Sequence, residues 1–114
     1  MSRGRQEYDF KYGLSKRLRN LGYLVVWTGR TQLFDLVAAK QGSVYFLELK
    51  GRDTEHPEEQ KARQVAASRQ FHLLYAVVRQ GQKRGRLEVE MYDRGRLIHW
   101  DTTMLGDDLS KWVR

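Results

Sequence analysis

The sequence contains no cysteine, one proline and no long apolar run. The lack of cysteine excludes disulfide bonds, thiolate zinc sites and a cysteine nucleophile. No apolar segment approaches the roughly 20 residues that a membrane-spanning helix requires. The N-terminus is basic, but the apolar segment of a secretory signal does not follow it. We therefore expect a cytoplasmic protein.

The charge is strongly unbalanced, with a formal net charge of +7 and an isoelectric point of about 9.9. Arginine outnumbers lysine two to one, and the planar fork of arginine suits bidentate contact with phosphate. A nucleic acid is thus the first candidate partner, well ahead of an anionic membrane surface. A chain of 114 residues is long enough for one compact domain, which we expect to span residues 1–114.

Apolar periodicity predicts an α/β fold. Side chains that recur at three- and four-residue spacing indicate helices, and runs of β-branched and aromatic residues indicate strands. Helices are expected at 7–21 and 57–69, with a short one in the tail at 104–114; strands are expected at 23–28, 34–39, 43–50, 71–78, 87–92 and 97–100. This order predicts a mixed central sheet flanked by helices.

The strand at residues 43–50 carries two charges in an unusual place. Alternation puts Glu48 and Lys50 on one face, whereas the rest of the strand is apolar on both faces. The strand is therefore expected to be central. Burial of an unpaired charge costs roughly several kcal/mol. The two charges therefore either form a structural ion pair or serve a site at the end of the strand.

Asp35 begins the preceding strand, between two apolar residues. If the strands at 34–39 and 43–50 form a hairpin, counting outward from the turn at 41–42 brings Asp35 close to Glu48. Two adjacent carboxylates repel unless a cation lies between them, and Mg²⁺ prefers oxygen ligands and retains water. A metal-bound water could attack phosphorus, with Lys50 orienting it or stabilising the developing charge. Taken alone, Asp35 would more often be a turn or cap residue.

A third acid, Glu7, continues the apolar stripe of the first helix. It could point toward the sheet and join the two other carboxylates. It could equally be a glutamate in the first helical turn that interacts with the helix dipole.

These residues resemble a known nuclease signature. Phe34-Asp35, twelve intervening residues and Glu48-Leu49-Lys50 resemble the motif of the PD-(D/E)XK superfamily, with phenylalanine in place of the usual proline. Within it, the basic N-terminus, Glu7, the segment Gly22-Tyr23-Leu24-Val25-Val26 and Asp35-Leu36-Val37-Ala38 are most similar to archaeal-type Holliday junction resolvases. The resemblance covers residues 7 to about 78 and implies a restriction-endonuclease-like core.

The resemblance also implies roles for individual residues. Asp35, Glu48 and the carbonyl of Leu49 would bind Mg²⁺, for which Mn²⁺ could substitute, and Glu7 is a possible further ligand. Lys50 would be catalytic and Glu7 would assist. A homodimer would nick opposed strands of a four-way DNA junction. The loop serine of the family has no clear match here, although Thr31 or Thr28 could replace it.

Other interpretations stay open. In the VRR-NUC branch of the same superfamily, which cuts flap or branched DNA, a glutamine follows on the next helix, and Gln60 matches that position; an isolated helical glutamine is more often solvated. A non-catalytic DNA-binding module and a ribosomal or RNA-associated basic protein are alternatives of a different class.

Two further groups of residues can be assigned from the sequence. The arginines at Arg3, Arg5, Arg30 and Arg52 lie in predicted termini and loops, where they could contact phosphates without reading bases. The tryptophans Trp27, Trp100 and Trp112 are expected in the core or at a dimer interface rather than on a base-stacking surface.

Overall fold

The computed structural model of the chain describes residues 3–29, 33–104 and 109, without the side chains of residues 3–6 and 104. Its elements are α1 (Arg3–Asn20), β1 (Leu24–Trp27), β2 (Leu36–Lys40), β3 (Ser43–Lys50), α2 (Glu58–Phe71), β4 (Leu74–Gln80), β5 (Arg86–Asp93) and β6 (Arg96–Met104). The described helices include none that is long and apolar enough to cross a bilayer.

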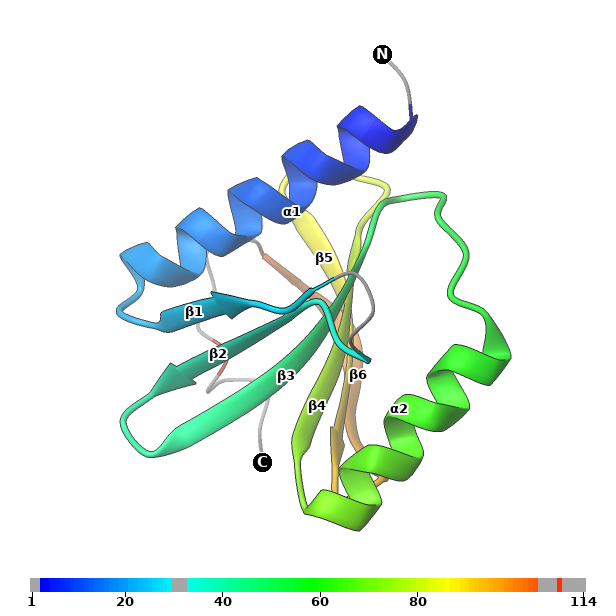
Figure 1. Cartoon of the computed structure of the whole chain (residues 1–114). Coiled ribbons are helices and arrows are strands. Elements are labelled where there is room, and N and C mark those ends of the chain that lie inside the picture. The colour runs from blue at the N-terminus through cyan, green and yellow to red at the C-terminus, as the bar shows by residue number, and fades with distance from the viewer. Residues whose placement is uncertain (1–2, 30–32, 105–108, 110–114) are drawn as a thin grey trace.

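The strands form one six-stranded sheet in the order β1-β2-β3-β4-β5-β6. Four of the neighbouring pairs are antiparallel, and only β3 and β4 run parallel. A parallel pair needs a crossover, and α2 provides it (Figure 1). The mixed sheet and the order of its elements confirm the predicted fold class, and β3 is an inner strand as its apolar faces predicted.

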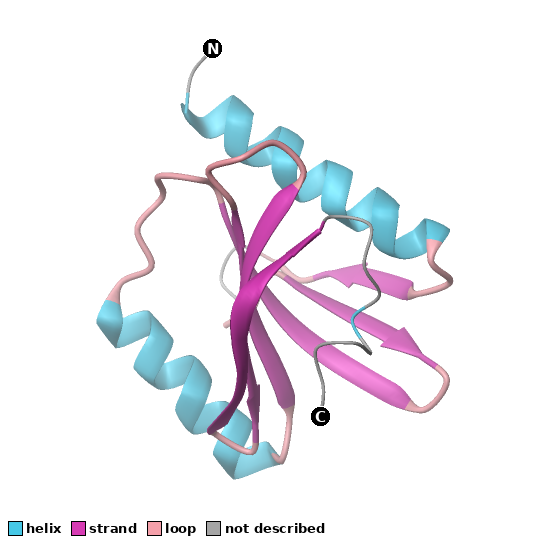
Figure 2. Ribbon diagram, turned by 180° about the vertical axis from the view of Figure 1, so that it is seen from behind, coloured by secondary structure: helices cyan, strands magenta, loops and turns pink. Residues whose placement is uncertain are grey.

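The two helices cover opposite faces of the sheet (Figures 1 and 2). Alternation along β3 sends Leu47 and Leu49 toward α1, where they join Leu14 and Leu18 in an aliphatic core. The other face carries an aromatic cluster beneath α2, with rings of neighbouring residues at centroid distances of 5.3–5.4 Å. Its buried members are the aromatic residues Phe34, Tyr75 and Tyr92, together with Val77.

Some boundaries differ from the predicted ones. The apolar run that begins at Phe71 predicts a strand, but α2 continues through Phe71 and ends at His72, which adopts a left-handed conformation with φ of 55°. β4 therefore starts at Leu74. In the tail, β6 extends to Met104, so a helix does not begin there. Most of the predicted tail helix lies outside the described residues.

Two of the three tryptophans lie outside the core, and their alternative place at a dimer interface stays a prediction. Trp27 is 41% exposed and Trp100 is 69% exposed. Trp27 belongs to β1 and Trp100 to β6, the two edge strands of the sheet. An edge strand has a neighbouring strand on one side only. Trp112 lies outside the described residues.

Candidate active site

The register of the β2–β3 hairpin brings the two predicted carboxylates together. Leu36 pairs with Leu47, so the preceding residue, Asp35, lies opposite Glu48. The main-chain N–H of Asp35 donates to the carbonyl of Leu47 at 2.9 Å, which continues the ladder beyond the strand. Counting outward from the turn therefore predicted this pairing correctly.

Asp35 is fixed by its main chain and by its side chain. Its Oδ2 accepts a hydrogen bond of 2.8 Å from the main-chain N–H of Leu49. Its main-chain carbonyl accepts hydrogen bonds from the N–H of Thr28 at 3.0 Å and the hydroxyl of Thr28 at 3.1 Å. The same hydroxyl also donates to the carbonyl of Phe34. Thr28, which directly follows β1, thus helps to position the main chain of Asp35.

Glu48 is buried, with only 3% of its surface exposed. Its Oε2 lies 3.2 Å from Nζ of Lys50, and the side chain of Lys50 is only 11% exposed. Burial, and then the charge of Asp35, raise the pKa of the Glu48 carboxyl, although Lys50 and Gln64 oppose the rise. An added cation beside the two carboxylates would favour the charged form of Glu48.

Gln64 of α2 orients the side chain of Glu48 through a hydrogen bond. It is completely buried, and its Nε2 donates to Oε1 of Glu48 and to the carbonyl of Leu33, both at 2.8 Å. Its Oε1 accepts hydrogen bonds from the hydroxyl of Tyr75 and from Nε2 of His56, the latter at 2.8 Å. Every hydrogen-bonding group of this amide therefore has a partner, which fixes its orientation.

The first helix brings Glu7 and a residue that the sequence did not single out. Lys11 lies one turn after Glu7, and its Nζ is 3.4 Å from Oε1 of Glu7 and 3.5 Å from Oδ2 of Asp35. Oε2 of Glu7 accepts a 3.0 Å hydrogen bond from the hydroxyl of Thr54. Glu7 thus points toward the segment that follows β3, and Lys11 links it to Asp35, but Glu7 does not join the two other carboxylates directly.

The loop after β3 is anchored by arginine. Arg79 donates to the carbonyl of Gly51 at 3.1 Å and to the carbonyl of Thr54. Nε of Arg52 donates to the carbonyl of Gly81 at 2.7 Å. These contacts tie the loop to the end of β4 and hold Thr54 where it meets Glu7.

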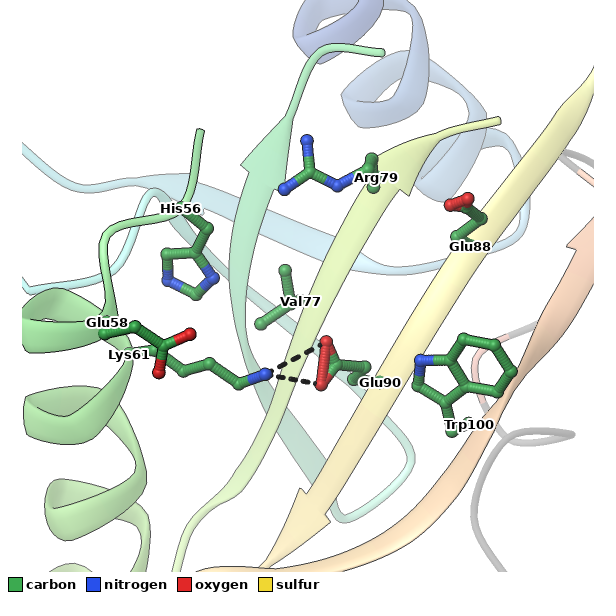
Figure 3. A pocket seen from close by; sticks show the side chains of 8 residues that line it. All are labelled: His56, Glu58, Lys61, Val77, Arg79, Glu88, Glu90 and Trp100. Atoms are coloured by element: carbon green, nitrogen blue, oxygen red, sulfur yellow. Dashed lines mark hydrogen bonds and ion pairs between the residues drawn. The ribbon is translucent and has the colours of Figure 1, made fainter. Parts of the chain in front are cut away.

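A pocket of about 180 Å³ opens next to these residues on the side of α2 (Figure 3). Val77, which pairs with Glu48 in the sheet, lies at its centre. Lys61 donates two hydrogen bonds to Glu90 across the pocket, at 2.7 and 3.1 Å. The lining residues are His56, Glu58, Lys61, Val77, Arg79, Glu88, Glu90 and Trp100.

Two side-chain carboxylates, Asp35 and Glu48, are the candidate ligands for a metal ion. The described residues contain no group of three or more histidine, aspartate or glutamate side chains placed to hold one. Two carboxylates are nevertheless sufficient for Mg²⁺, which commonly takes one or two and completes its shell with water and phosphate oxygens. Burial, and then repulsion from Asp35, raise the pKa of Glu48, and such an ion would relieve the repulsion.

The structure brings Asp35, Glu48 and Lys50 together and, among the described residues, links Glu7 to Asp35 only through Lys11. It also selects a different glutamine. Gln64, one helical turn after the predicted Gln60, contacts Glu48. Gln64 and Ser68 are four residues apart in α2, and both are buried. This spacing on one helix face is the sequence pattern that could have identified Gln64. Thr31, Arg30 and the side chains of Arg3 and Arg5 lie outside the described part of the chain.

Comparison with known proteins identifies the fold. Neither a model of a protein family nor a curated protein matches the sequence. Among solved structures, the chain is similar to Hjc, a Holliday junction resolvase from the archaeal hyperthermophile Archaeoglobus fulgidus, with a TM-score of 0.59 and 15% sequence identity. The match covers 77% of this chain and 72% of that chain. The chain therefore has the restriction-endonuclease-like fold of an archaeal Holliday junction resolvase, as its sequence motifs predicted.

Proposed function

We propose that the protein is a metal-dependent, structure-specific DNA endonuclease that resolves four-way junctions by paired nicks. The observation that carries the proposal is the convergence of Asp35, Glu48 and Lys50 at one end of a resolvase-like sheet. A basic chain with a net charge of +7 suits a DNA substrate. Such an enzyme would work in the cytoplasm, inside the cell with its DNA substrate.

Asp35 and Glu48 would hold Mg²⁺ or Mn²⁺, with the carbonyl of Leu49 as a further ligand. When bound, the ion would act as a Lewis acid toward the phosphate and lower the pKa of a water molecule. The chain contributes the preorganisation: the N–H of Leu49 orients Asp35, and Gln64 orients Glu48.

Lys50 is placed for the chemical step. Its ammonium group lies against Glu48 and is largely shielded from water. A positive charge in such a site can orient the attacking water or stabilise the charge that develops on the phosphate oxygens, and it acts more strongly there than in bulk water. Glu7 would assist from α1, where Lys11 and Thr54 hold it beside the loop after β3.

Resolution of a four-way junction by paired nicks requires two such sites. A symmetric homodimer would present two active sites to opposed strands of a junction, and one subunit alone would make one nick at a time. Shape-selective binding needs phosphate contacts more than base contacts, which fits the many arginines of the chain.

A second candidate is a flap or branched-DNA nuclease of the VRR-NUC type. The observation in its favour is the glutamine of α2 that hydrogen-bonds to Glu48. Both candidates use the same chemistry and differ in substrate. A non-catalytic DNA-binding module is disfavoured because Asp35, Glu48 and Lys50 are all retained, at the cost of burying charge.

The test is cleavage of labelled DNA with and without Mg²⁺. A four-way junction, a flap and a linear duplex of matched sequence are incubated with the protein, and the cut positions are mapped on every strand. Symmetric paired nicks on the junction alone support resolution, and cuts near the branch of the flap support the second candidate. Absence of cleavage of all three substrates with either Mg²⁺ or Mn²⁺ would refute both.

A further inference from the structure

A groove of about 290 Å³ lies between α1 and the end of β1, outside the carboxylate cluster. It is lined by three aromatic side chains, Tyr8, Tyr12 and Trp27, and by Lys11. All three aromatics are exposed, by 66%, 54% and 41% respectively. Large aromatic side chains that are exposed together commonly mark a binding surface.

The aromatic side chains already form part of a stack. Tyr8 and Tyr12 are one helical turn apart, so they project from the same side of α1. Their ring centroids lie 6.3 Å apart and their planes differ by only 11°. Trp27 of β1 lines the same groove. A flat ligand in the groove would therefore contact aromatic side chains from two different elements.

The groove adjoins the candidate active site directly. Lys11, which lines it, lies 3.5 Å from the carboxylate of Asp35. Trp27 immediately precedes Thr28, which hydrogen-bonds to the main chain of Asp35. A ligand in the groove would thus be separated from the carboxylates by a single side chain.

We infer that this groove binds an unpaired nucleobase of the DNA strand next to the phosphate that is cut. The inference rests on the proposed function and extends it to a subsite. Base–aromatic stacking tolerates any base because each has a π-face. Lys11 is the cation that lines the groove, and it would exchange its contact with Glu7 or Asp35 for the adjoining phosphate. The groove would favour DNA with unstacked nucleotides, such as a branch point, over continuous duplex.

The pocket of Figure 3 also carries an exposed tryptophan, but its charge is less suitable. Trp100 is accompanied there by Glu58, Glu88 and Glu90. The three carboxylates of that pocket outnumber its two cations, Lys61 and Arg79. The groove of Tyr8, Tyr12 and Trp27 is lined by a lysine and by no acid. Trp100 is therefore a matched control: an exposed tryptophan near the site that is expected to leave DNA binding unchanged.

The test measures binding without cleavage, in a Lys50→Ala background. The probes are a four-way junction with 2-aminopurine at the branch point and a duplex of matched sequence. Trp27→Ala, Tyr12→Leu and Tyr8→Leu are each expected to weaken junction binding by about 5- to 100-fold. Duplex affinity should change by less than about twofold, since its bases stay stacked. Tyr12→Phe should retain junction affinity because the ring is preserved.

Several results would overturn the inference. These are unchanged junction affinity, an equal loss of junction and duplex affinity, or an equal loss in Trp100→Ala. A change of sedimentation mass in Trp27→Ala without selective loss of junction binding would assign the groove to a second copy of the chain instead. Selective loss supports the inference even if the wild-type protein cuts none of the DNA substrates, a result that would refute the proposed function alone.

Discussion

The two faces of the sheet use different kinds of side chain for different tasks. Beneath α1, Leu14, Leu18, Leu47 and Leu49 pack in a largely aliphatic core, which also contains Tyr23 and Tyr45. Beneath α2, aromatic residues surround a buried polar network in which Gln64 joins Glu48, Tyr75 and His56. The first arrangement stabilises the fold through burial of apolar area. The second holds charged groups in place, and each of its polar groups needs its partner.

The largest expected effect on stability comes from the aliphatic face. Leu18 is 1% exposed, and Leu18→Ala should lower the free energy of unfolding by about 2–5 kcal/mol through lost burial and a residual cavity. Urea denaturation measures this loss. Leu24→Ala is the control, because Leu24 is an exposed leucine and its truncation should cost less than about 0.5 kcal/mol. Cleavage per folded molecule should be unchanged in both variants. A loss of cleavage in Leu18→Ala would contradict the assignment of separate tasks to the two faces.

The opposite face should respond to metal. Mg²⁺ at a hundred times its Kd should stabilise the wild-type protein by about 2.7 kcal/mol, because it binds the folded state. Asp35→Asn should abolish most of this gain, since it removes one carboxylate of the pair. Thermal denaturation with increasing Mg²⁺ measures the effect. Equal stabilisation of the wild type and Asp35→Asn would place the ion elsewhere.

A third prediction separates the two glutamines of α2, with an expected cost in stability comparable to that of Leu18→Ala. Gln64→Leu leaves Tyr75 and the carbonyl of Leu33 without their partner, at a cost of about 1–3 kcal/mol for each stranded group. It should also reduce Mg²⁺ affinity or cleavage by about 10- to 100-fold, because Glu48 loses its orienting donor. Gln60→Leu, one turn earlier, is the matched control and should change neither property. The reverse order of effects would restore Gln60 as the functional residue.

The smallest effect concerns the Lys61–Glu90 ion pair at the rim of the polar face. Burial raises the pKa of Glu90, but hydrogen bonds from Lys61 and Tyr92 outweigh it and leave the pKa below its ordinary value of 4.5. The pair should therefore contribute stability above about pH 4.5 and lose it as the pH falls through the lower folded value. Glu90→Gln should cost about 0.2–1 kcal/mol at pH 7. Chemical denaturation at pH 7 and pH 3 measures the difference, which should shrink at pH 3; a pH-independent cost would point to packing instead.

The sequence predicted the elements that depend on local patterns. β3 runs from Ser43 to Lys50 as predicted, because alternating apolar residues bounded by a turn mark it clearly. The pairing of Asp35 with Glu48 followed from the short turn at residues 41–42, where Gln41 and Gly42 both have positive φ. A tight hairpin fixes its register, so counting along the chain was sufficient.

The sequence could not show contacts that depend on how α2 lies on the sheet. Gln60 and Gln64 are one turn apart, and α2 has few large apolar residues to mark its inner face. The rotation of the helix, set by its packing on Tyr75 and Tyr92, decides which glutamine meets Glu48. Lys11 was missed for a related reason: its link to Asp35 depends on where α1 crosses the end of the sheet. The exposure of Trp27 likewise depends on how far α1 covers β1.

The most direct test of the active-site assignment is single-turnover cleavage of a labelled four-way junction by the wild type and by Lys50→Ala. Junction affinity is measured in parallel under non-cleaving conditions. Loss of the positive charge beside Glu48 should reduce the cleavage rate by about 10²- to 10³-fold, the usual cost of removing one group that stabilises transition-state charge. Junction affinity should stay within about threefold of the wild type, since most of the binding energy comes from other phosphate contacts. Full activity of Lys50→Ala with Mg²⁺ would contradict the assignment of Asp35, Glu48 and Lys50 as the nuclease centre.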